Sequence, residues 1–207
     1  MSDFKTEQEA FWAGEFGKDY IGRNEGRELL ASNLNFFTSA LKSADKINSC
    51  IEFGANIGMN LKAIQLLHPS VKINAIEINK IAAKELGSVI GEENVFNGSI
   101  YDYNVSEKFD LSIIKGVLIH INPDMLHVVY DKLYNSSSKY ILVCEYYNPS
   151  PVTITYKGHD DRLFKRDFAG EMLDKYQDLK LIDYGFVYIR DTVFPQDDVT
   201  WFLMEKK

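Results

Sequence analysis

The sequence predicts an α/β fold in which a mostly parallel sheet is covered by helices on both faces. Two observations lead to this prediction. Apolar runs of strand length alternate with stretches of helical spacing between residues 49 and 147, and two further apolar runs follow near the end without a helix between them. Strands that alternate with helices are joined by right-handed crossovers, which give a parallel sheet. The last two runs are expected to form an antiparallel pair at the sheet edge.

The individual strands and helices follow from local patterns. The first strand is SCIEF (49–53), and the next stretch, MNLKAIQLLH (59–68), places Leu61, Ile64 and Leu67 on one helical face. After it come a strand at 71–78, a helix at 79–90, strands at 93–98 and 109–116, a helix at 123–135 opened by proline, and a strand at 139–147. A helix near 169–176 precedes the last two runs, 180–191 and 198–206, so that seven strands are predicted.

The chain is predicted to form one domain. Its 207 residues suffice for one sizeable core, and no Ser/Pro/Gly-rich linker divides them. Within this domain, residues 1–40 are expected to be an N-terminal helical extension or lid, and residues 41–207 the α/β unit. The sequence leaves the oligomeric state open.

Composition and charge exclude several classes of function. Thirty acidic against 23 basic residues give a net charge of −7, which does not favour nucleic acid as a partner. No segment approaches the roughly 18 apolar residues of a membrane helix, and the first residues lack an apolar signal core, so a cytoplasmic protein is expected. Cys50 and Cys144 stand in predicted buried strands without metal-ligand spacing, and no metal is expected.

The turn after the first strand is the first candidate site. Ligands of open parallel sheets bind beyond the carboxyl ends of the strands. There Gly54 permits a tight turn, and the helix that opens near Gly58 offers unpaired N–H groups. The dinucleotide pattern GxGxxG would need glycines where this chain has Asn56 and Met59, which disfavours a dinucleotide. Glu52, just before the turn, suits a ligand that carries positive charge.

The motif EFGANIG (52–58) resembles the glycine motif of class I S-adenosylmethionine-dependent methyltransferases, with Asn56 in place of the middle glycine. This resemblance implies a Rossmann-like, doubly wound sheet, S-adenosyl-L-methionine as cofactor and S-adenosyl-L-homocysteine as product. The cofactor contacts expected from it are Tyr20, Arg23, Glu52, Gly54, Ala55, Asn56, Gly58, Glu77, Ile78, Ser99, Ile100, Lys115 and Gly116.

Several of these contacts have specific expected roles. Glu77 ends the second strand, 23 residues after Gly54, where a carboxylate accepts ribose hydroxyl protons; the alternative is a solvated charge at a strand end. By resemblance, Ser99 and Ile100 contact the adenine, and the backbone at Lys115 and Gly116 contacts the methionine amino group. Tyr20 and Arg23 are expected to cover the carboxylate end of the cofactor.

The two ends of the chain narrow the resemblance. The stretches at 7–24, 145–174, 183–191 and 197–206 resemble methyltransferases associated with pseudaminic acid biosynthesis. This implies methyl transfer to a sugar, either a nonulosonic acid or its nucleotide-activated precursor. Two alternatives stay open: an O- or N-methyltransferase for small molecules outside sugar metabolism, and a non-catalytic cofactor-binding partner in a pathway.

Candidate residues for the substrate follow the fifth strand. Positive charge gathers there and would hold a carboxylated sugar, with arginine as a bidentate donor; the alternative is a solvated basic loop paired with nearby aspartates. The expected substrate contacts are Tyr146, Tyr156, His159, Arg162, Lys165 and Arg166. A hydroxyl acceptor has to lose a proton, and the candidate bases are, in order of preference, His120, Glu145 and His159. His120 has the alternative of packing beside the helix opened by proline.

Overall fold

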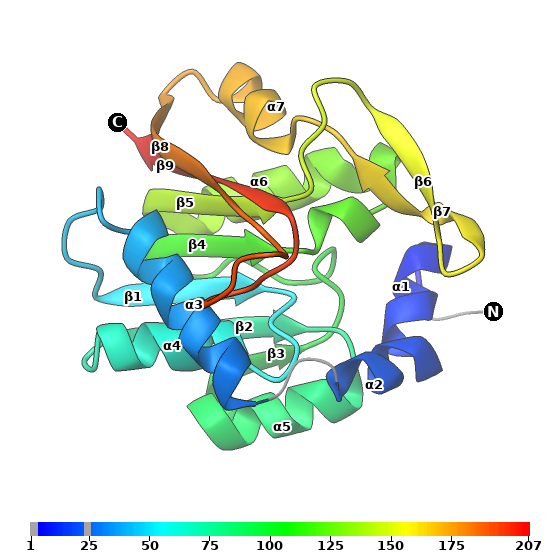
Figure 1. The fold of residues 1–207 in the computed structure, drawn as a ribbon, viewed down its shortest axis with the longest axis horizontal. Helices are drawn as coiled ribbons and strands as arrows, with labels where there is room; N and C mark the ends of the chain where they lie inside the picture. Colours follow the sequence, from blue (N-terminus) through cyan, green and yellow to red (C-terminus); the bar gives the residue numbers. More distant parts are fainter. Residues whose placement is uncertain (1–3, 23–25) are drawn as a thin grey trace.

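The structure, a computed structural model, describes residues 4–22 and 26–207, with the side chains of residues 159–161 left aside. Its main sheet has seven strands in the order β3-β2-β1-β4-β5-β9-β8 (Figure 1). The strands are β1 (Ser49–Phe53), β2 (Lys72–Glu77), β3 (Val95–Asn97), β4 (Phe109–Lys115), β5 (Ser137–Glu145), β8 (Leu179–Val187) and β9 (Val199–Lys206). β1 to β5 run parallel, and β9 is antiparallel to both β5 and β8. The predicted mostly parallel sheet with an antiparallel edge pair is confirmed.

The strand order reverses beside β1. The chain runs outward from β1 through β2 to β3 and then returns to place β4 on the other side of β1. Loops that leave the carboxyl ends of β1 and β4 therefore diverge and leave a crevice between them, which is where open α/β sheets bind ligands.

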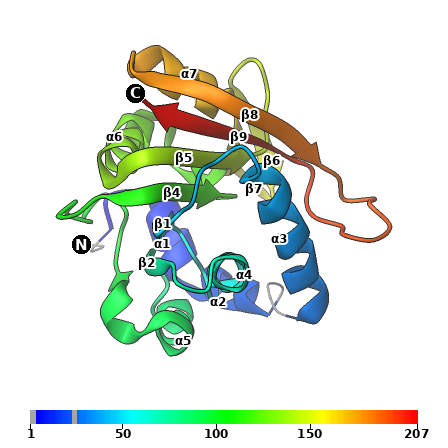
Figure 2. The same ribbon diagram turned by 90° about the vertical axis from the view of Figure 1, so that its left-hand side faces the viewer.

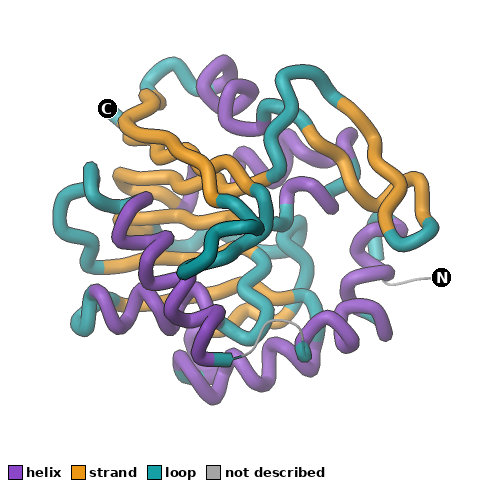
Figure 3. The backbone as a smooth tube through the Cα atoms, viewed as in Figure 1, coloured by secondary structure: helices purple, strands orange, loops and turns teal. Residues whose placement is uncertain are grey.

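Helices cover both faces of the sheet (Figure 3). The α-helices are α1 (Glu7–Ala13), α2 (Glu15–Ile21), α3 (Arg27–Ala40), α4 (Met59–Leu67), α5 (Lys80–Ile90), α6 (Leu126–Ser136) and α7 (Phe168–Lys175). Short 3-10 turns are η1 (Glu92–Asn94), η2 (Leu118–His120) and η3 (Pro123–Met125). None of the helices within 4–22 and 26–207 combines the length and the apolar character that crossing a lipid bilayer requires.

The core consists of two layers, one on each face of the sheet. α3, α4 and α5 pack on one face of the sheet, the face to which Leu111 and Ile113 of β4 belong. α6 and α7 pack on the opposite face, which β4 presents through Phe109 and Ile114. Ile113 and Ile114 point to opposite faces because of the two-residue period of a strand, whereas Phe109 and Leu111 do so because the strand is irregular between them. Each such fully buried side chain contributes about 1.5–3 kcal/mol to stability.

The stretch after β5 contains a hairpin that the sequence analysis did not assign. β6 (Val152–Tyr156) and β7 (His159–Lys165) pair antiparallel and form a separate two-stranded sheet beside α1 (Figure 1). The two residues between them, Lys157 and Gly158, have φ angles of +52° and +85°. Such left-handed residues make the tight turn of a two-residue hairpin, so the alternating VTIT run followed by Lys-Gly was the available signal.

Asn79 attaches the N-terminal helices to the sheet layer. Its side-chain oxygen accepts hydrogen bonds from the backbone of Ile81 and Ala82 and so caps α5. Its side-chain nitrogen lies 3.3–3.4 Å from the backbone oxygens of residues 12–14, at the junction of α1 and α2. One buried amide therefore holds both a helix start and the position of the two helices.

Two substitutions of Asn79 separate these roles. We expect Asn79→Ala to lower the free energy of unfolding by about 1–2 kcal/mol, because the cap is lost. Asn79→Asp keeps the cap, since aspartate caps helices equally well, but loses the donor to the α1–α2 junction. Urea unfolding measures the first effect. Hydrogen exchange measures the second, and exchange of residues 7–21 that is as slow in Asn79→Asp as in the wild type would contradict the attachment.

Candidate functional site

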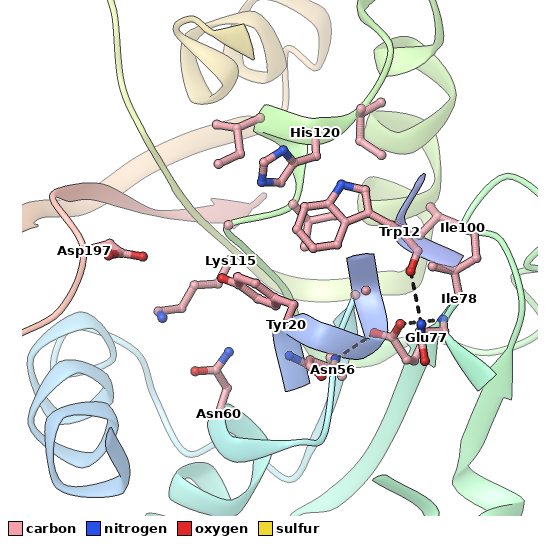
Figure 4. Close-up of a pocket in the computed structure, with 18 of the residues that line it drawn as sticks. Trp12, Tyr20, Asn56, Asn60, Glu77, Ile78, Ile100, Lys115, His120 and Asp197 are labelled. Carbon is pink, nitrogen blue, oxygen red and sulfur yellow. Dashed lines mark hydrogen bonds between the residues drawn. The ribbon is translucent and has the colours of Figure 1, made fainter. Parts of the chain in front are cut away.

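A cavity of about 700 Å³ opens at the carboxyl ends of β1, β2 and β4 (Figure 4). Its walls come from the loop after β1, the ends of β2 and β4, helices α1 to α3, the β6–β7 hairpin and the β8–β9 loop. The predicted site residues that line it are Tyr20, Gly54, Ala55, Asn56, Glu77, Ile78, Ser99, Ile100, Lys115, Gly116, His120, Tyr146 and Tyr156.

The floor of the cavity is the turn between β1 and α4. The backbone N–H groups of Gly54 and Ala55 both donate to the carbonyl oxygen of Ile76, at 2.8 and 3.1 Å. Gly54 has φ +75°, and a Cβ there would lie 2.6 Å from a methyl of Val117. Asn56 also has a positive φ, +49°. The turn therefore depends on glycine at position 54, both for its conformation and for the close approach of Val117.

Glu77 forms one side wall at the end of β2. Its Oε2 accepts a hydrogen bond from the backbone N–H of Asn56, and its Oε1 accepts one from that of Asn79, both at 2.7 Å. Burial raises the pKa of this carboxyl, and the backbone donors act in the opposite direction. The backbone N–H of Ile78 also acts on this carboxylate, and since a carboxylate has about four acceptor positions, one remains for a hydroxyl group of a ligand. Ile78, Ser99 and Ile100 continue this wall.

Glu52 lies below the turn and does not line the cavity. Its side chain is fully buried, and its Oε1 accepts a hydrogen bond from Asn60 Nδ2 at 2.6 Å. Burial raises the pKa of Glu52 to about 8, although Asn60 and the charge of Lys115 lower it. Asn60 and Lys115 do line the cavity, so Glu52 is connected to the cavity wall through a hydrogen bond to the first and the charge of the second. Gly58, with φ +82°, also lies outside the wall and starts α4 instead.

His120 forms the upper wall, together with aromatic rings. Its Nδ1 lies 2.6 Å from the backbone oxygen of Arg162, and because a carbonyl only accepts, Nδ1 carries the hydrogen. Burial lowers the pKa of His120 to about 4, so the ring is neutral near pH 7 and Nε2 has a free lone pair. The rings of Trp12 and Tyr156 lie 4.6 and 5.3 Å from it, centroid to centroid.

Glu145 supports this wall from below rather than forming it. It is 2% exposed and does not line the cavity. Its Oε1 accepts hydrogen bonds from the backbone of Val117 at 2.9 Å and Leu118 at 2.8 Å, at the start of the turn that carries His120. Burial raises the pKa of Glu145 to about 7, and these donors oppose the shift. The expectation that Glu145 faces the substrate as a base is therefore not met.

The predicted basic cluster does not face the cavity either. The guanidinium of Arg162 lies 3.2 Å from Glu7 of α1. Arg166 pairs with Glu171 at 2.5 Å, and the ammonium of Lys165 lies 5.0 Å from the ring centroid of Tyr146. These side chains connect structural elements, and none of the three lines the cavity. The side chain of His159 and the whole of Arg23 lie outside the described part of the chain.

The structure adds wall residues that the sequence analysis did not select. They are Gln8, Glu9, Trp12, Asn33, Asn60, Gln196 and Asp197. Asn33 and Gln196 are both buried and hydrogen-bonded at 2.9 Å, although 163 positions separate them. Of the seven, Trp12 alone had a signal, because it stands in an aromatic stretch. The others belong to α1, α3, α4 and the β8–β9 loop, and only the fold brings them together.

Comparisons with known proteins agree on the fold. No protein-family model matches the chain, and no curated protein matches it. Among solved structures, the 1,6-didemethyltoxoflavin N1-methyltransferase of Burkholderia thailandensis has 14% identity and a TM-score of 0.70, over 100% of this chain and 93% of that one. The magnesium protoporphyrin IX methyltransferase of Synechocystis has 13% identity and a TM-score of 0.66, over 99% and 100%.

A third structure, an S-adenosylmethionine-dependent methyltransferase from Clostridium acetobutylicum, has 11% identity and a TM-score of 0.63, over 93% of this chain and 98% of that one. Identities of 11–14% describe a likeness of architecture. The chain has the Rossmann-like fold of class I S-adenosylmethionine-dependent methyltransferases.

Proposed function

We propose that the protein is an S-adenosylmethionine-dependent methyltransferase that acts on a small molecule. The observation that carries this proposal is the composition of one cavity. At the reversal point of the sheet, it unites the Gly54 turn, the carboxylate of Glu77 and the neutral ring of His120. Four solved structures with this fold are described as methyltransferases, and three of them hold S-adenosylhomocysteine.

The lining residues fit the cofactor. Glu77 has acceptor capacity left for a ribose hydroxyl, and Ile78 and Ile100 offer apolar surface to a purine. Gly54, Gly116 and Tyr20 line the part of the cavity left for the methionine end. A cavity of about 700 Å³ lies within the range of ligand pockets. When bound, the cofactor supplies a methyl group already activated by its positive sulfur.

The chain itself provides positioning and a proton acceptor. Nε2 of His120 accepts the hydrogen of an acceptor hydroxyl, since Nδ1 is held in the protonated state by the carbonyl of Arg162. Trp12 and Tyr156 confine the acceptor beside His120 and keep water away. Correct alignment of two reactants contributes several kcal/mol in such transfers, because translational and rotational freedom is already lost on binding.

For the acceptor, we propose a nonulosonic sugar or its nucleotide-activated precursor. Its support is the resemblance of the chain ends to the methyltransferases of pseudaminic acid biosynthesis. Flat rings such as Trp12 and Tyr156 suit a sugar, and Lys115 and Lys157 are cations on the described cavity wall that suit its carboxylate. A small-molecule acceptor outside sugar metabolism would use the same cofactor residues, and a non-catalytic partner would bind cofactor without turnover.

Cofactor binding is tested by calorimetry with S-adenosylmethionine and S-adenosylhomocysteine. Glu77→Gln is expected to weaken binding of both about 10- to 100-fold, because a hydrogen bond to a charged group contributes about 1.5–3 kcal/mol. Glu85→Gln, on the exposed part of α5, serves as the matched control with unchanged affinity. Thermal unfolding of each variant separates lost binding from lost fold. Wild-type protein that gives no heat with either compound would refute the enzyme proposal.

Methyl transfer is tested with labelled S-adenosylmethionine and a panel of free and nucleotide-activated nonulosonic acids, their precursors and unrelated small molecules. With any acceptor that is methylated, His120→Asn should lower kcat about 10²- to 10⁴-fold and leave affinity for S-adenosylhomocysteine within about threefold. His127→Asn, on an exposed face of α6, is the control. Equal rates in His120→Asn and wild type would remove His120 as the base.

The pH dependence of transfer gives a further readout for His120. Because burial lowers its pKa to about 4, His120 stays neutral through pH 6, where an ordinary histidine would be largely protonated. We therefore expect no loss of rate from His120 between about pH 8 and pH 5. A fall in rate centred near pH 6.5 that disappears in His120→Asn would contradict this placement of its pKa.

A further inference from the structure

The outer edge of the main sheet carries exposed apolar side chains, and of these only Ile189 also lines the cavity described above. β8 is the last strand in the sheet order, and among the described residues it pairs with β9 alone (Figure 2). Six large apolar residues in β8 or just after it are between 36% and 66% exposed: Leu181, Ile182, Tyr184, Phe186, Tyr188 and Ile189. We call these six residues the β8 strip.

The density of the β8 strip sets it apart from the rest of the surface. Fourteen large hydrophobic residues of the described chain are exposed, and six of them fall within these nine positions. Single exposed apolar residues are ordinary, whereas contiguous ones mark interaction sites. The strip also coincides with a strand whose outer N–H and C=O groups have no strand partner in the described chain, which makes it a template for another strand.

The regular part of this edge strand, residues 183–187, has little of the usual protection. Soluble proteins place charged residues or proline on such edges to prevent pairing. Between residues 181 and 189 the charged residue is Asp183, and its carboxylate is held by Ser43 Oγ at 2.7 Å and Lys42 Nζ at 3.5 Å. These contacts hold the Asp183 carboxylate against the residues that follow α3. The carboxylate therefore does not block another strand from pairing with β8.

We propose that β8 pairs with β8 of a second copy of the chain, which gives a two-fold symmetric dimer with one continuous sheet. Two identical strands related by a two-fold axis pair antiparallel. A bulge interrupts the β8–β9 ladder between Leu181 and Asp183, so the regular part is 183–187, with Gly185 at its middle. An axis at Gly185 sets Tyr184 opposite Phe186 of the second copy.

This register favours a second copy over other partners, because the strip matches itself. About the same axis, Asp183 lies opposite Val187 of the second copy, and the carboxylate of Asp183 is already held by Ser43 and Lys42. Ile182 and Tyr188, both exposed and apolar, then come next to each other just beyond the regular part of the strand. At roughly 150–200 Å² for each large side chain, about half exposed, the strip presents about 450–600 Å² per copy. With the strand edge added, this approaches the roughly 800 Å² per partner of a stable interface.

The oligomeric state of the full chain tests the proposal. Sedimentation or light scattering at about 1–100 µM should give twice the chain mass of 23.7 kDa for the wild type. Tyr184→Asp with Phe186→Asp should raise the dissociation constant at least about 100-fold and give monomers, because two charges per copy enter an apolar interface. Leu66→Asp on α4, where Leu66 is 56% exposed, is the matched control and should remain dimeric.

Two outcomes would overturn the proposal: a wild type that is monomeric at about 100 µM, or a dimer that persists in the double aspartate variant. Both substituted side chains are more than half exposed, so the fold should be retained, and unchanged thermal unfolding checks this. As a direct readout, Tyr184→Cys with Phe186→Cys should cross-link under mild oxidation, since opposite residues of antiparallel strands lie within disulfide reach. Cys50 and Cys144 are buried and do not compete.

Discussion

One buried carboxylate organises the site. Glu77 holds the backbone of Asn56 with one oxygen and that of Asn79 with the other, so it joins the turn after β1 to the start of α5. Asn79 in turn reaches the junction of α1 and α2. The carboxylate of Glu77 therefore connects the turn that forms the floor of the cavity with the start of α5, and through Asn79 with the helices α1 and α2. Its burial cost is offset by its backbone donors, as a buried carboxylate requires.

Two further buried acidic side chains, Glu52 and Glu145, make the stability of the folded state depend on pH. Both have pKa values raised above the ordinary value by burial, to about 8 and about 7. The folded state thus favours their neutral forms, and this contribution to stability is present below pH 4.5 and is lost as pH rises through the raised values. His120 acts in the opposite sense, because its lowered pKa makes the folded state lose stability as pH falls from 6.5 toward 4.

The sheet and the cofactor side of the cavity were predictable because their signals are local. Short sequence patterns predict β1, α4 and β2 in turn, and the Gly54 turn follows β1 directly. Glu77 was placed by its strand end in the same way. The opposite wall had no such signal: Asn33 and Gln196 meet across 163 positions.

The side chains of the basic cluster also have partners that the sequence did not indicate, and Arg162 is the clearest case. Arg162 was expected to hold the substrate, yet its guanidinium pairs with Glu7, which stands 155 positions earlier. The distance in sequence is what hid the pairing. The contribution of Arg162 to the cavity is its backbone oxygen, a group that every residue type carries and that no sequence pattern marks.

These contacts couple the acceptor side of the cavity into one unit. The carbonyl of Arg162 fixes the hydrogen of His120 on Nδ1, while its guanidinium attaches the β6–β7 hairpin to α1, the helix that carries Trp12. The rings of Trp12 and Tyr156 both lie tilted beside the same histidine. A displacement of α1 or of the hairpin would therefore alter both the shape of this part of the cavity and the ring nitrogen of His120 that carries the hydrogen. The cofactor side rests on the sheet, whereas the acceptor side rests on segments added around it, so the two can change independently in size and chemistry.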